Sequence, residues 1–76
     1  MIKELDSVVL TRDVKANGLL KGDVGAVVHV YKDGAAFEVE FIAADGKTIA
    51  VLTLEKIDIR PISGKEILHV RELQPA

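Results

Sequence analysis

The stretch over residues 20–31, LKGDVGAVVHVY, constrains the fold more than any other part of the chain. Glycine accepts backbone conformations that other residues avoid, and β-branched residues favour strands because they pack well on a pleated surface. We therefore interpret Gly22, Asp23 and Gly25 as a structural turn that leads into a strand over residues 24–31. Within it, Gly25 would let a neighbouring strand or side chain approach closely. Such a strand requires a sheet around it.

Four more segments carry strand patterns. Residues 36–42 alternate most cleanly, with Phe37, Val39 and Phe41 on one face and glutamates between them. Aspartate–glycine pairs predict tight turns before and after this segment. The other predicted strands cover residues 5–11, 47–54 and 59–61, with a loop over 12–23 and a single helical turn over 55–58. Together they predict an all-β domain, a small five-stranded SH3-like barrel over residues 1–61.

Residues 62–76 extend beyond what such a barrel needs. We interpret them as a C-terminal extension that packs on the barrel or on a neighbouring chain. The β-branched residues around His69 favour a sixth strand. A helix is the alternative, with Ser63 as its N-cap, Glu66 three residues later and apolar residues at roughly helical spacing.

Few residues of the chain could carry out catalysis. The absence of cysteine excludes disulfides and thiolate chemistry. The serines and threonines stand in no nucleophile motif, and the six glycines form no phosphate-binding loop. Asp6, Asp13 and Asp23 could gather around the first loop, but carboxylates that fix turns are the better interpretation. We therefore expect no enzymatic activity, no catalytic residue and no cofactor.

His29 and His69 are the only histidines. If their strands paired, both could reach one metal ion, with a carboxylate as the third ligand. Each histidine is bracketed by apolar residues, however, and this favours a partly buried side chain that is hydrogen-bonded to its surroundings. We therefore expect no metal site.

The charge balance bears on the kind of partner. The net charge is −2, whereas proteins that bind nucleic acids cluster Lys and Arg to neutralise phosphates. Arg12, Lys15, Lys21 and Lys32 are interleaved with aspartates, so nucleic-acid binding is the alternative function and not the first. No apolar run reaches the roughly 18 residues that span a bilayer. We expect a cytoplasmic protein without a membrane partner.

Apolar residues exceed the number that the predicted core can hold. Both faces of the segment 47–54 are apolar, although a lone barrel needs only one apolar face. We interpret the surplus as an interaction surface made of Tyr31, Ile42, Ile49, Val51, Ile67, Leu68, Val70 and Leu73. Such a surface predicts a non-enzymatic protein-interaction module and a homo-oligomer, most simply a symmetric dimer.

Four blocks of the chain, residues 5–11, 18–31, 37–41 and 58–61, resemble a known family. Their pattern is similar to that of small bacterial proteins catalogued as a domain of unknown function with an SH3-like barrel. The resemblance implies the barrel and carries over no catalytic residue. Some members are encoded near toxin-like genes, so it also implies an accessory or antitoxin-like role with a protein partner encoded nearby.

Overall fold

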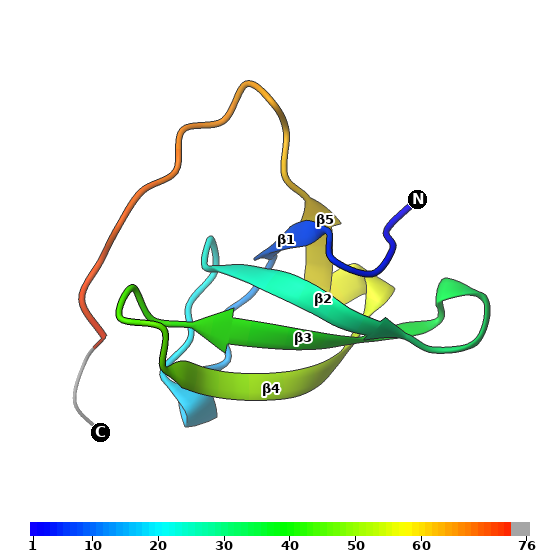
Figure 1. Ribbon diagram of the computed structural model, residues 1–76, viewed down its shortest axis with the longest axis horizontal. Coiled ribbons are helices and arrows are strands. Elements are labelled where there is room, and N and C mark those ends of the chain that lie inside the picture. Colours follow the sequence, from blue (N-terminus) through cyan, green and yellow to red (C-terminus); the bar gives the residue numbers. More distant parts are fainter. Residues whose placement is uncertain (74–76) are drawn as a thin grey trace.

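Five strands form one antiparallel sheet in the computed structural model, which describes residues 1–73 (Figure 1). The strands are β1 (Ser7–Leu10), β2 (Val24–Val30), β3 (Ala36–Ile42), β4 (Thr48–Glu55) and β5 (Ile59–Pro61). Three short 3-10 turns accompany them: η1 (Lys15–Asn17), η2 (Lys32–Gly34) and η3 (Lys56–Asp58). The strand order is β4-β3-β2-β1-β5, so the last strand returns to pair with the first.

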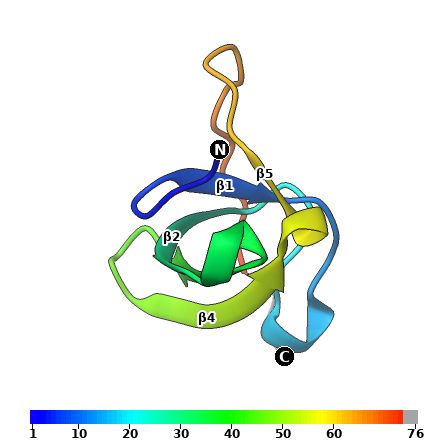
Figure 2. The same cartoon turned by 90° about the vertical axis from the view of Figure 1, so that its right-hand side faces the viewer.

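The prediction of an all-β fold with five strands is confirmed, and β3 and β5 have the predicted bounds. β1 is shorter than predicted, because Leu5 adopts a positive φ of 74° that interrupts an extended chain. The expectation of a closed barrel is corrected. The sheet coils around its core (Figure 2), but β4 and β5 are its two edges, and no ladder joins them within residues 1–73. The chain crosses between these edges through η3.

The core lies on the inner face of the coiled sheet. Successive side chains of a strand point to opposite faces, so Phe37, Val39 and Phe41 of β3 are all buried. They pack with a mainly aliphatic set from the other strands and the β1–β2 loop: Val8, Leu10, Leu19, Val27, Leu54 and Ile59. The end of the predicted loop over 12–23 is expected to place Leu19 or Leu20 in the core, and Leu19 is the residue that lies there.

The turn before β2 is held by Gly22 and Asp23. Gly22 has a φ of 95°, a conformation that glycine adopts without steric cost. Its amide donates a hydrogen bond to the Leu10 carbonyl at 2.9 Å. The Asp23 carboxylate accepts one from the Leu20 amide at 2.9 Å. The turn therefore connects β1 to the start of β2 and leaves the Asp23 side chain partly buried at this junction.

Gly25 lies where β2 passes over the side chains of β3. A Cβ atom built on Gly25 would lie 2.6 Å from Val39 Cγ1 and 2.8 Å from Phe41 Cε1. Both distances are shorter than van der Waals contact, so the packing of these strands requires the missing side chain. This is the close approach that the sequence suggests.

A register shift in the β3–β4 pair changes the direction of Ile49. The shift follows the Phe41–Ala50 pair and leaves Ile49 as an extra residue of β4. Its side chain packs against the core, whereas Val51 stays exposed on the outer face. Simple alternation places both residues outward. That expectation is wrong for Ile49, because the bulge displaces it.

Residues 62–73, which we call the arm, form neither a strand nor a helix. The arm leaves β5, arches away from the sheet and returns beside the β1–β2 loop and the β3–β4 turn (Figure 1, orange to red). Figure 2 shows the arch standing clear of the sheet. The predicted sixth strand and its helical alternative are both wrong over this range, and residues 74–76 lie outside the described part.

The described chain contains no helix with the length and apolar character needed to cross a membrane.

A candidate interaction site on the arm

The base of the arm is anchored by a bidentate ion pair. Arg60, which belongs to β5, donates from Nη1 and Nη2 to the two carboxylate oxygens of Glu66 at 2.8 and 2.7 Å. The Ser63 amide also donates to Glu66 Oε1 at 2.7 Å. The hydrogen bonds from Arg60 and Ser63 lower the pKa of Glu66 from 4.5 to about 2. The arm therefore begins with a tight loop that is held to the sheet.

The Ser63–Glu66 spacing that suggests a helix start has a different role. Glu66 accepts the hydrogen bond from the Ser63 amide, as the glutamate of a capping box does. The Glu66 amide donates to the Ser63 carbonyl at 3.1 Å and closes a single turn, which does not continue into a helix within the described residues, and the Glu66 carboxylate also binds Arg60. The Ser63–Glu66 hydrogen bond that the sequence suggests is therefore present, but it belongs to a loop that is held to β5 by Arg60 and not to a helix.

The far end of the arm is anchored by Arg71. Its Nε donates to Asp23 Oδ1 at 2.9 Å, and its Nη2 donates both to Asp23 Oδ2 and to the Gly18 carbonyl, the latter at 2.9 Å. Burial raises the pKa of Asp23, but the hydrogen bonds from Arg71 and the Leu20 amide outweigh it and leave the pKa below 3.8. Asp23 thus fixes the turn and also binds the arm.

The segment between the two anchors has little support. The side chains of Ile67, Leu68 and Val70 are exposed at 91%, 71% and 88%. From Ile67 to Leu73, no backbone amide donates a hydrogen bond to any atom of residues 1–73. Pairing of peptide groups in hydrogen bonds and burial of large apolar side chains both lower the free energy. The arm is therefore a segment without regular secondary structure whose main chain and large apolar side chains have few partners within residues 1–73.

Two cavities lie between the arm and the sheet. The first, of about 450 Å³, lies where β2 begins and β3 ends, and we call it the arm groove. Its walls include Leu19, Val24, Phe41, Ile42, Ile49, Val70, Arg71 and Leu73. The second, of about 420 Å³, lies under the arch and is lined in part by Val9, Val24, Ile62, Ile67 and Leu68. Both are mainly apolar, so the arm covers the end of the sheet without filling the space beneath it.

The eight apolar residues of the predicted interaction surface do not form one patch. Ile42, Ile49, Val70 and Leu73 line the arm groove, and Ile67 and Leu68 line the cavity under the arch. Tyr31 lies near the opposite hairpin, with its ring centroid 4.6 Å from that of His29 and its hydroxyl 3.3 Å from Glu38. Val51 stands on the outer sheet face opposite Glu40. The structure therefore brings six of the eight to the arm.

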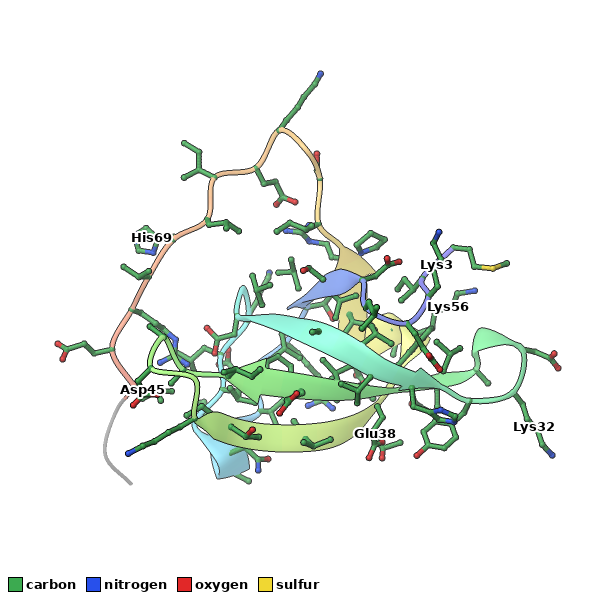
Figure 3. All side chains as sticks on the ribbon, viewed as in Figure 1. Lys3, Lys32, Glu38, Asp45, Lys56 and His69 are labelled. Atoms are coloured by element: carbon green, nitrogen blue, oxygen red, sulfur yellow. The ribbon has the colours of Figure 1, made fainter. Side chains whose placement is uncertain are left out.

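The histidines and aspartates of the sequence analysis are also dispersed. His29 lies on β2, with Nδ1 3.8 Å from Glu4 Oε2, whereas His69 lies on the arm (Figure 3). Among residues 1–73, no group of three or more His, Asp or Glu side chains is placed to hold a metal ion. Asp6 accepts a hydrogen bond from the Lys3 amide near the N-terminus, whereas Asp13 and Asp23 accept from the Lys21 and Leu20 amides within the β1–β2 loop. All three aspartates therefore hold backbone turns or loops, and Asp23 also binds Arg71.

Sequence reasoning missed the two ion pairs that place the arm. Asp23 and Arg71 are 48 residues apart, and no periodicity relates positions at such a distance. For Glu66, the spacing from Ser63 indicated the hydrogen bond to the Ser63 amide, but nothing in the sequence indicated the contact with Arg60. The anchors explain why the arm follows its own course instead of continuing the sheet.

The arm is expected to stay docked at neutral pH and to detach in acid. The pKa of Asp23 and that of Glu66 both lie below their ordinary values of 3.8 and 4.5. Their contribution is therefore complete above pH 4.5 and is lost as the pH falls towards about 2. Amide chemical shifts of residues 67–73 should move over this range towards those of the Arg71→Gln variant. Shifts that match the variant already at neutral pH would contradict the docked arm.

A protein-family model matches the part of the chain that contains the sheet. It describes a domain of unknown function (DUF4926) and covers residues 4–61. No curated protein and no solved structure matches the chain. The matched range includes all five strands and ends where the arm begins.

Proposed function

This chain belongs to the DUF4926 family, a domain of unknown function, and we propose that it acts as a non-enzymatic protein-interaction module whose binding element is the arm. The family match confirms the predicted resemblance to a domain of unknown function, while a bacterial source and a cytoplasmic location stay predictions. The family description names no activity that could be transferred to this chain. The proposal is therefore argued from the exposed residues and unpaired main chain of this molecule.

One observation carries the proposal. The arm presents Ile67, Leu68 and Val70 to solvent on an extended backbone whose amides are unpaired within residues 1–73. Extended segments of this kind bind by strand addition, in which main-chain hydrogen bonds supply affinity and alternate side chains supply specificity. Both ends of the arm are held by ion pairs. This limits the conformational entropy that binding would cost.

The distribution of positive charge supports a protein partner over nucleic acid. Each of the three arginines is paired with a carboxylate: Arg12 with Asp58, Arg60 with Glu66 and Arg71 with Asp23. An arginine engaged in this way would have to leave its carboxylate before it could neutralise a phosphate. The lysines remain dispersed among the aspartates. We therefore propose a protein as the partner, in an accessory or antitoxin-like role, and keep nucleic acid as an outcome of the test.

Aspartate at two arm positions is expected to abolish binding without affecting the fold. The Ile67→Asp/Val70→Asp variant places charges in the proposed interface and should reduce recovery of bound proteins about tenfold or more. The measurement is capture by the tagged full chain from a lysate of its source, with and without nuclease, followed by mass spectrometry. Untagged copies of the chain count among the captured proteins.

The matched control is Leu5→Asp/Ile57→Asp, which changes two apolar residues that are 87% and 79% exposed and lie outside the arm. It adds the same charge and should bind as the wild type does. Equal recovery by the two double variants would contradict the proposal. Loss of all bound material after nuclease treatment would replace it with nucleic-acid binding.

A further inference from the structure

We propose that the arm is exchanged between two copies of this chain, so that Arg71 of one copy binds Asp23 of the other in a two-fold symmetric dimer. This inference rests on the proposed function, because it names the partner of the same arm. Each copy would then complete the arm groove of its neighbour.

The two anchors of the arm would behave differently in such an exchange. The Arg60–Glu66 pair joins residues six apart and stays within each chain. The Arg71–Asp23 pair joins residues 48 apart, so it can form within one chain or between two chains, according to which copy the end of the arm reaches. The segment between them, residues 67–70, is the part that would cross to the second copy. It has no backbone hydrogen bond to the rest of residues 1–73 that would break on crossing.

The occupant of the groove is identified by what the groove already binds. Asp23 and the Gly18 carbonyl accept three hydrogen bonds from Arg71, and Val70 and Leu73 of the arm line the same cavity. A second copy carries the same arginine and the same apolar residues. Exchange therefore reproduces the contacts of the arm's end with Asp23, Gly18 and the groove with no new chemistry, which is why swapping of an element is a low-cost route to a dimer.

Exchange would also satisfy the groups that the single chain leaves exposed. A two-fold axis that passes between the two crossing segments, perpendicular to them, places them side by side in antiparallel orientation. Their unpaired amides and carbonyls can then hydrogen-bond to each other. Ile67 and Leu68, both largely exposed in one chain, would be covered by their counterparts. The exchanged dimer thus has contacts that the closed monomer lacks.

Charge reversal at the far anchor distinguishes exchange from closure within one chain. Asp23→Arg and Arg71→Asp each create a like-charged pair, both within a chain and between identical chains. In an equimolar mixture, only contacts between the two different chains pair opposite charges. We expect the wild type to have twice the mass of a single chain by sedimentation velocity at tens of micromolar. Each reversed chain should be monomeric, and their mixture should regain the doubled mass.

The doubly reversed chain, Asp23→Arg/Arg71→Asp, is the control for folding, because it restores opposite charges in every arrangement and should dimerise. Native mass spectrometry should show one chain of each kind in the mixed dimer. The inference is overturned by a monomeric wild type, by single variants that remain dimeric, or by a mixture that stays monomeric while the doubly reversed chain is folded. If the arm nevertheless captures other proteins from lysate, the proposed function survives and its partner is a different protein.

Discussion

Replacing Gly25 by alanine is expected to lower the free energy of unfolding by about 2–3 kcal/mol, the upper range for overpacking a filled core. The new Cβ would lie 2.6 Å from Val39 Cγ1, 2.8 Å from Phe41 Cε1 and 3.0 Å from the Glu40 carbonyl oxygen. Val39 and Phe41 are buried, and the Glu40 carbonyl belongs to the neighbouring strand, so none of the three can move aside cheaply. Gly25→Val, which adds two methyl groups, should prevent folding.

Urea denaturation followed by circular dichroism measures the effect, with Gly64→Ala as the matched control. A Cβ at Gly64 meets nothing within 4 Å. The control should therefore unfold within about 0.5 kcal/mol of the wild type, as surface substitutions usually do. If Gly25→Ala were as stable as Gly64→Ala, β2 and β3 would not pack as closely as the structure has them.

Replacing Asp58 by alanine is expected to cost about 2–3 kcal/mol, the usual range when a buried charged acceptor is removed and its donors lose their partner. Asp58 is only 8% exposed, and it accepts hydrogen bonds from Arg12 Nε at 2.8 Å and from the Glu55 amide at 2.9 Å. These contacts hold η3, the turn that carries the chain from β4 to β5. Without them, η3 loses the side-chain contacts that fix it between the two edge strands.

The same side chain should make stability depend on pH. The hydrogen bond from Arg12 is the main reason that the pKa of Asp58 lies below its ordinary value of 3.8. Its contribution is therefore complete above that value and is lost as the pH falls through the lower pKa of the folded state. Thermal unfolding should show a smaller loss of stability in acid for Asp58→Asn than for the wild type. Parallel curves for the two proteins would show that Asp58 does not carry this dependence.

Local patterns were sufficient for the strands and turns. The alternation of Phe37, Val39 and Phe41 with glutamates predicted β3 to the residue, because a half-buried strand sorts its side chains with a period of two. Gly22 indicated the turn and Gly25 indicated a close approach, although the sequence does not say which residues approach Gly25. These features depend on residues that are adjacent in sequence, and a single sequence displays them directly.

Local sequence patterns do not predict interactions between residues that are distant in the chain. The bulge at Ile49 arises from how β4 pairs with β3 and turns an expected surface residue towards the core. The end of the arm goes where Asp23 holds Arg71, although its β-branched residues favour a strand by themselves. β-propensities span only about 1 kcal/mol per residue, and a bidentate ion pair together with a groove can override them.

The sequence by itself determined an all-β domain, its five strands and the turn at Gly22, Asp23 and Gly25, because each is encoded by neighbouring residues. It also showed that apolar residues exceed what one core can hold. Only the tertiary structure decided where that surplus lies, since six of the eight predicted surface residues meet at the arm while Tyr31 and Val51 lie apart from it. The physical reason is that two ion pairs, Arg60–Glu66 and Arg71–Asp23, set the course of the arm, and the second joins residues that are close only after folding.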